Sequence, residues 1–270
     1  MCPNCRAFIT TSDKICPYCN TPVGPRAIER RNPGAILGGL IPHAQFVTSM
    51  ILLINFGLYA ATAVYSMRSG AGGWMDIDGQ TLIAFGAKLR LAIFSYGQWW
   101  RLVTAGFLHG GLMHIGMNSW VLYDLGAQAE QIYGARRFIV IYFVSSVCGF
   151  LASTFWSASI SIGASAGLFG LIGAMIAIGV RHKSALGMAI RGLYVRWAIY
   201  GLLLGLLWPG IDNAAHVGGV AAGFGCGYLA GLPSIVENFT ERIWRIAAYA
   251  CLLLTAYSFV QMFLWFRSSS

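Results

Sequence analysis

Three short polar motifs lie inside stretches of the chain that are otherwise apolar. The first surrounds Ser165, the second runs from His109 through His114 to Asn118, and the third contains His216. Strongly polar residues within a membrane are costly and usually mark a function. A serine nucleophile, a histidine base and side-chain hydrogen-bond donors are the groups that acyl transfer requires. The three motifs therefore predict a hydrolytic serine site within a bilayer.

The composition indicates a membrane protein. The chain has 270 residues, of which 57% are hydrophobic and 10% charged, and its mean hydropathy is +0.65. These values lie outside the range of soluble globular domains, so we expect an all-α polytopic membrane protein. Seven charge-poor stretches approach the ~20 residues that a spanning helix needs: Phe46–Met67, Met113–Tyr133, Phe138–Trp156, Ile162–Val180, Trp197–Trp208, Asn213–Leu232 and Ile243–Phe266. The fifth stretch is short unless it begins near Leu193 or tilts little.

Basic residues predict the orientation. With a cytoplasmic N-terminus, 13 of the 18 lysines and arginines fall on the inner side, as the positive-inside rule requires. The first 45 residues are polar and cysteine-bearing, so no cleavable signal peptide is expected. The net charge of +9 follows from this topology and gives no support for nucleic-acid binding. We expect an integral multi-pass protein of a bacterial inner membrane.

The topology predicts that the three motifs meet. The second, fourth and sixth stretches all begin on the outer side, and each motif lies near one of these beginnings. The motifs therefore share one side of the membrane and a similar shallow depth. This places the predicted site where it opens to the outer side.

A stripe of glycines predicts which helices touch. Gly219, Gly223 and Gly227 recur on the helix face that carries His216, and such small-residue stripes let membrane helices approach closely. The fourth stretch is also rich in small residues, so close packing would bring Ser165 within hydrogen-bond reach of His216. Taken alone, the glycines are also compatible with packing only, and the histidine with a bond to a carbonyl. The serine on the opposite helix favours the functional interpretation.

The serine needs a base because its hydroxyl is a weak nucleophile. His216 is the candidate, first as the base and then as the acid that protonates the leaving amine. Asp212 precedes it by four residues, but we expect this aspartate in the outer loop and therefore predict a Ser-His dyad. Phe169, one turn after Ser165, is positioned to stack on the imidazole.

An oxyanion site is predicted opposite the serine. His114 and Asn118 share one helix face at i and i+4, and their N–H groups can converge with the backbone N–H of Ser165 near a helix N-terminus. Gly163 belongs to the same site. The alternative role for Asn118 is a helix–helix hydrogen bond. His109 is assigned to support of the loop.

Taken together, these residues resemble the rhomboid family of intramembrane serine proteases. The shared motifs are a GxSx sequence at Gly163–Ala166, an HxxxN sequence at His114–Asn118, a further histidine at His109, Trp100-Arg101 in the first outer loop, and AHxxG followed by GxxxG at Ala215–Gly223. The resemblance covers roughly Phe46 to Leu232. Ala166 departs from the glycine that many members have, and Phe169 stands where some have tyrosine.

The resemblance implies a six-helix core with Ser165 and His216 as the dyad and His114, Asn118 and the Ser165 backbone as the oxyanion site. The seventh stretch matches the six-plus-one arrangement of part of the family. The loop from Ser66 to Leu108 would lie half in the interface. Substrates would be single-span proteins that unwind near the outer leaflet. Separately, the proline and glycine in Trp208-Pro209-Gly210 predict a lateral gate at the end of the fifth stretch.

Four cysteines near the N-terminus predict a metal site. Cys2 and Cys5, and then Cys16 and Cys19, form two CxxC pairs separated by ten residues. This spacing is typical of a ribbon around one tetrahedral zinc ion, with redox or iron chemistry as the alternative and a disulfide disfavoured in a reducing cytosol. Four thiolates close the coordination shell, so the zinc is structural and catalysis needs no cofactor.

The predicted organisation has four parts: a cytosolic zinc ribbon at 1–22, a basic Pro/Gly linker at 23–45, the six-helix protease core at 46–232, and a loop with the seventh helix at 233–270. The expected partners are transmembrane protein substrates, the lipid bilayer and a possible protein partner of the ribbon. Two rival functions stay open. One is a catalytically silent rhomboid-like binder of membrane helices, and the other is a channel or transporter lined by the polar residues.

Overall fold

The computed structural model describes residues 4–5, 7, 15–21, 45–234 and 236–269. The chain divides into two compact units, Met1–His43 and Ala44–Ser270. In the described part of the second unit the regular elements are helices. In chain order they are α1 (Phe46–Ser69), α2 (Gly79–Ala84), α3 (Arg90–Tyr96), α4 (Arg101–Thr104), η4 (Ala105–Phe107), α5 (Leu112–Val121), η5 (Leu122–Gly126), α6 (Ala127–Trp156), α7 (Ser165–Arg181), α8 (Ala185–Leu207), α9 (Asn213–Ala230) and α10 (Phe239–Ser269).

Four helical stretches are long and apolar enough to cross a membrane: α1, Leu112–Trp156 (α5 to α6), α8 and most of α10. The helix α7 is apolar but has only 17 residues. The stretch from α5 to α6 turns back at Gly134, whose φ of 72° and ψ of 157° are not helical. Glycine adopts this left-handed φ without the steric cost that a side chain brings. The second and third predicted spans therefore separate where expected.

The fifth predicted span was placed too late in the chain. The helix begins at Ala185, not at Trp197, and the Ser184 side chain caps it by accepting a hydrogen bond from the Gly187 N–H. Arg191 and Arg196 interrupted the apolar pattern of the sequence. Both lie on exposed positions of the helix, where long basic side chains can reach polar surroundings.

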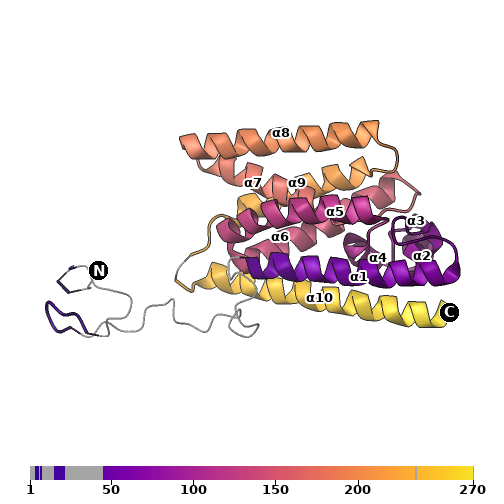
Figure 1. Cartoon of the computed structure of the whole chain (residues 1–270). Coiled ribbons are helices and arrows are strands. Elements are labelled where there is room, and N and C mark those ends of the chain that lie inside the picture. Colours follow the sequence, from indigo (N-terminus) through magenta and orange to yellow (C-terminus); the bar gives the residue numbers. More distant parts are fainter. Residues whose placement is uncertain (1–3, 6, 8–14, 22–44, 235, 270) are drawn as a thin grey trace. The chain divides into compact units, whose positions relative to one another are not determined.

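The long helices run side by side, with α8 on one flank of the bundle and α1 and α10 on the other (Figure 1). At the centre, α7 packs against α6, α8 and α9, and 13 of its 17 residues are buried. By contrast, only 11% of the residues in the 18-residue apolar stretch of α8 are buried inside the bundle. The corresponding value for α10 is 17%. These outer helices present apolar side chains to lipid.

The closest helix contact joins α7 to α9. A Cβ atom at Gly219 would overlap the backbone of Ala166, and one at Gly223 would overlap the backbone of Gly170. Without side chains at these positions the two backbones meet directly. This is the close approach that the glycine stripe predicts.

The segment from Ser66 to Leu108 is built of short helices, and a buried arginine holds them together. The Arg101 guanidinium donates from Nη1 to the carbonyls of Ile83 (2.7 Å) and Ala87 (3.0 Å) and from Nε to Gln98 Oε1 (2.6 Å). Only 1% of this arginine is exposed. The Trp100-Arg101 motif therefore fixes the fold of this segment.

A second buried arginine attaches α10 to α6. Arg137 donates from both terminal nitrogens to the carboxylate of Glu241 at 2.8 Å, and Nε donates to the Ala230 carbonyl. Both side chains are almost fully buried. The adjacent Arg136 instead forms an exposed pair with Glu237 at 3.4 Å.

We expect Arg137→Ala to lower the free energy of unfolding by about 3 kcal/mol, because it leaves the Glu241 carboxylate buried without its partner. The matched variant Arg136→Ala should cost less than about 1 kcal/mol, as exposed pairs do. Unfolding in detergent micelles, followed by circular dichroism, measures both. Equal destabilisation by the two variants would contradict this role of the buried pair.

Candidate active site

Ser165 is the first residue of α7 and is partly exposed. Two residues earlier, Gly163 has a φ of 120°, and its N–H donates to the Ala105 carbonyl at 2.9 Å. The left-handed φ lets the chain turn sharply into the helix. This turn brings Ser165 Oγ to 3.0 Å from His216 Nε2.

The His216 ring is buried in the first turn of α9 and is held by stacking. It lies on the Phe169 ring with centroids 4.0 Å apart and an interplanar angle of 13°. Its Nδ1 atom has no hydrogen-bond partner among the described residues. The structure thus brings Ser165, His216 and Phe169 together, and in the part of the chain that it describes no carboxylate is hydrogen-bonded to Nδ1 of the ring.

His114 and Asn118 lie beside Gly163. A Cβ atom built on this glycine would be 2.7 Å from His114 Nε2 and 3.7 Å from Asn118 Nδ2, so both side chains border the space next to it. The Gly110 N–H donates to His114 Nδ1 at 3.3 Å. A neutral ring that accepts at Nδ1 carries its proton on Nε2. His114 therefore presents a donor toward Gly163.

Asn118 and His109 each contact His114. Asn118 Nδ2 donates to the His114 carbonyl at 3.1 Å. The His109 ring is fully buried and packs edge-on against the His114 ring, with centroids 5.1 Å apart. Neither ring nitrogen of His109 has a hydrogen-bond partner among the described residues, so its supporting role stays a prediction.

Lys88 is a residue of the site that the sequence did not reveal. It is fully buried, and its ammonium donates to the carbonyls of Ser157 (2.8 Å) and Ser159 (3.1 Å). Its backbone pairs with Ser161 through two hydrogen bonds. Lys88 therefore holds the segment that leads into Ser165. A single lysine in a loop carries no motif, so only the fold identifies it.

Asp212 is the N-cap residue of α9. It does precede α9 in a loop, as predicted, but it is half-buried and caps the helix by accepting the Ala215 N–H at 3.1 Å. It also accepts a hydrogen bond from Ser153 Oγ of α6. Burial raises the pKa of Asp212, but hydrogen bonds from Ser153, Ser161 and Ala215, together with the Lys88 charge, outweigh burial and lower the pKa overall. Asp212 therefore fixes the beginning of α9, the helix that carries His216.

Three of the four predicted metal ligands lie together in the first unit. The sulfur atoms of Cys5, Cys16 and Cys19 all lie within 4.8 Å of one another, and those of Cys5 and Cys16 are 3.7 Å apart. Zinc–sulfur bonds of ~2.3 Å in a tetrahedron place sulfurs ~3.8 Å apart, whereas a disulfide bond is ~2.05 Å long. The described thiols therefore fit a tetrahedral ion. Cys2 lies outside the described residues.

The lowered pKa of Asp212 predicts how stability depends on pH. A carboxyl group whose pKa is lower in the folded state stabilises the fold above its unfolded pKa of about 3.9, and this contribution is lost as the pH falls through the folded pKa. Asp212→Asn should cost about 2 kcal/mol near neutral pH and should flatten the decline in acid. Thermal unfolding over the acidic range measures both. The exposed Asp124→Asn is the control, and matching curves for Asp212→Asn and wild type would contradict the capping role.

Comparison with known proteins identifies the family of this chain. The family model described as the Rhomboid domain matches residues 96–233, just over half of the chain. The rhomboid protease GluP of Bacillus subtilis is 35% identical over 154 residues, which cover 57% of this chain and 30% of that protein. RHOMBOID-like protein 7 of Arabidopsis thaliana is 40% identical over 154 residues, covering 55% and 48%. Inactive RHOMBOID-like protein 8 of the same plant is 37% identical over 123 residues, covering 44% and 35%.

The aligned regions span less than half the length of these relatives. Because the relatives come from plants as well as from a bacterium, they do not support the expected bacterial inner membrane. The matched residues 96–233 enclose Ser165, His216, His114 and Asn118. With a family model that covers just over half of its length, an all-helical fold and membrane-length apolar helices, this chain belongs to the rhomboid family.

Proposed function

We propose that this protein is an intramembrane serine endopeptidase that cleaves single-span membrane proteins near the outer leaflet. The observation that carries the proposal is the 3.0 Å approach of Ser165 Oγ to His216 Nε2 between two apolar helices. A buried histidine beside a partly exposed serine is the arrangement that activates a hydroxyl for acyl transfer. The family supports this chemistry, although one relative is named inactive.

In the proposed reaction the Ser165 hydroxyl attacks the scissile carbonyl carbon while His216 Nε2 takes its proton. The C–N bond then breaks, and the protonated Nε2 donates the proton to the leaving amine. This step leaves an acyl group on Ser165. A water molecule, deprotonated by the same Nε2, attacks the ester carbonyl, and Ser165 leaves with a proton returned from the imidazolium.

Donors for the developing oxyanion surround the space beside Gly163. We assign them to His114 Nε2–H, the Asn118 amide and the backbone N–H of Ser165 at the beginning of α7. The positive end of the helix dipole favours negative charge at this point. Loss of one such donor typically raises the barrier by about 3 to 4 kcal/mol. Phe169 holds the imidazole in orientation by stacking.

The position of Ser165 at one end of an apolar helix limits which peptide bonds of a substrate can reach it. The nucleophile lies at the beginning of α7, on the side that the basic residues assign to the exterior. A peptide bond within an intact helix has its carbonyl hydrogen-bonded and surrounded by side chains, so the substrate must unwind to reach Ser165. Small or helix-breaking residues near the scissile bond are therefore expected, and α8, whose end at Trp208 is exposed, is the proposed entry side.

Labelling with a fluorophosphonate tests the nucleophile directly. We expect wild-type protein to be modified at Ser165 and to cleave a model single-span substrate. Ser165→Ala should lose both activities, and His216→Ala should reduce cleavage by about 10⁶-fold and abolish measurable labelling, because the hydroxyl then lacks its base. Ser258→Ala is the control, because its hydroxyl bonds only the Leu254 carbonyl of its own helix.

A folded wild-type protein that is neither labelled nor active would contradict the protease and favour a silent binder of membrane helices. In that case binding of the model substrate should persist without cleavage. Labelling that survives Ser165→Ala would place the nucleophile at another residue and would also contradict the assignment.

We further propose that Cys2, Cys5, Cys16 and Cys19 hold one structural zinc ion in a cytosolic ribbon at 1–22, joined by the linker at 23–45 to the membrane core at 46–232. The spacing of the described thiols supports this assignment. A segment of this size buries too little apolar surface to fold without such a crosslink. The ribbon is the candidate binding module for a protein partner.

Metal analysis of the purified full-length chain should find one zinc per chain. Cys16→Ser should lose most of this zinc, because three thiolates leave the coordination shell incomplete. Cys226→Ser, which changes a cysteine of α9, should retain it. Proteolysis should survive removal of the metal, since the ion lies outside the proposed catalytic groups. Iron in place of zinc, or equal zinc in both variants, would contradict the site.

A further inference from the structure

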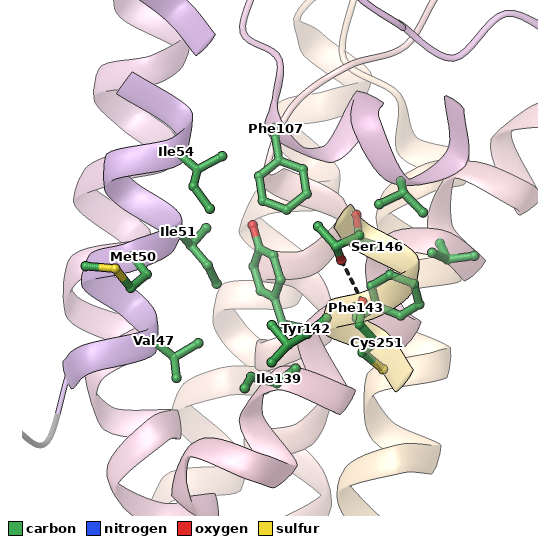
Figure 2. A pocket seen from close by; sticks show the side chains of 14 residues that line it. Val47, Met50, Ile51, Ile54, Phe107, Ile139, Tyr142, Phe143, Ser146 and Cys251 are labelled. Atoms are coloured by element: carbon green, nitrogen blue, oxygen red, sulfur yellow. Dashed lines mark hydrogen bonds between the residues drawn. The ribbon is translucent and has the colours of Figure 1, made fainter. Parts of the chain in front are cut away.

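A cavity of about 110 Å³ lies between α1, α6 and α10, with α4 and η4 at one side, and Ser165 is not among its lining residues. In Figure 2 the side chains of Ile51 and Ile54 from α1 face those of Tyr142 and Phe143 from α6 across this space, with Cys251 of α10 on the opposite side. Of the 14 lining residues, 11 have side chains of carbon or sulfur only. Such a lining favours hydrocarbon over water, which needs two to four polar partners.

The cavity opens toward the bilayer. Ile54 and Leu252 belong to its lining and are also 40% and 49% exposed on the outside of the bundle. The apolar lining of the cavity therefore continues onto the exposed surfaces of α1 and α10. The Thr255 hydroxyl in the lining already donates to the Cys251 carbonyl, whereas the buried Tyr142 hydroxyl has no hydrogen-bond partner among the described residues.

Aromatic rings close the cavity toward the predicted outer side. Phe107, which lines it, packs against Phe259 of α10 with centroids 5.3 Å apart. Farther along the same helices, Tyr65 of α1 packs against Phe266 of α10 at 5.3 Å. A chain in the cavity must therefore come from the opposite leaflet, which the basic-residue pattern assigns to the cytoplasm.

Arginines lie at the predicted cytoplasmic end of the cavity, on the faces of α6 and α10 that line it. Arg136 precedes the lining residue Ile139 by one turn, and Arg245 precedes Leu252 by two turns. Both pair with one carboxylate, that of Glu237, at 3.4 and 3.3 Å, which leaves an excess positive charge. The exposed Arg242 adds to this excess.

The distance between the two ends fits a lipid. Ten residues of α6 separate Arg136 from the lining residue Ser146, which corresponds to ~15 Å of helix. This is half of a ~30 Å hydrocarbon core, the depth that the chains of one leaflet fill. Basic clusters beside grooves between membrane helices are typical sites for anionic headgroups.

We propose that this groove binds one anionic phospholipid of the inner leaflet. Its phosphate contacts Arg136, Arg242 and Arg245, and one acyl chain occupies the cavity beside Tyr142. The site is separate from the proposed proteolysis and does not depend on it. The cavity also adjoins the helix that carries Ser165. The Tyr142 ring in its lining packs directly on Gly167 of α7, where a Cβ atom would be 2.7 Å from the ring.

Photo-cross-linking tests the site in the full-length chain. The protein is reconstituted into phosphatidylcholine vesicles that contain a trace of phosphatidylglycerol with a diazirine in its acyl chain. We expect cross-links in peptides that contain residues 139–147 and 251–255. Thr255→Phe should lower their yield by about tenfold or more, the loss expected when two methylene groups no longer fit. Leu253→Phe, on the lipid-facing side of the same helix, should leave the yield unchanged.

Because Thr255→Phe fills the cavity and can disturb the fold, binding of the lipid headgroup is tested with separate variants. Arg136→Gln and Arg245→Gln should each lower the yield by about fivefold, the effect of one basic residue near an anionic surface. A diazirine phosphatidylcholine should label the same peptides much less. Equal yields for Thr255→Phe and Leu253→Phe would overturn the proposal. Equal labelling by the two lipids would also overturn it, because the site would then not select an anionic headgroup.

Discussion

The close contact between the backbones of α7 and α9 is the constraint on which the site depends. Gly219 touches Ala166, the neighbour of Ser165, and Gly219 lies one turn after His216. Any side chain at this position would separate the two helices and lengthen the 3.0 Å distance from Ser165 Oγ to His216 Nε2. The pairing of serine and histidine is thus a consequence of how small residues pack in a membrane, where association depends on close van der Waals contact.

Two charged residues, the buried Lys88 and the half-buried Asp212, complete this arrangement near the beginnings of α7 and α9. Lys88 fixes the segment before α7, and Asp212 fixes the beginning of α9 against Ser153 of α6. Each of these charges has its polar partners in place, which is the condition under which a buried charge is tolerated. Two helices packed through small residues can still slide along each other. The hydrogen bonds of Lys88 to the segment before α7 and of Asp212 at the beginning of α9 oppose this sliding.

Much of this organisation follows from the sequence. Motifs near the beginnings of three apolar stretches predict which residues meet, because topology places those beginnings on one side and the glycine stripe predicts the contact. The early start of α8 could not be predicted, because Arg191 and Arg196 mask it in the apolar pattern although both are exposed. Lys88 was also missed, since its partners are carbonyls of Ser157 and Ser159, about 70 residues away, and backbone acceptors carry no signal in the sequence.

The separate positions of Asp212 and Phe169 bear on why the proposed dyad would need no carboxylate. A carboxylate on His216 Nδ1 would orient the ring, but it would place a second charge beside an apolar helix contact, where desolvation is costly. The nearest acid in the sequence, Asp212, instead binds the Ala215 N–H at the helix end. The Phe169 ring, stacked 4.0 Å from the imidazole, restricts the same rotation without any charge. Orientation by an aromatic face is therefore the solution that the low polarity of the surrounding helices favours.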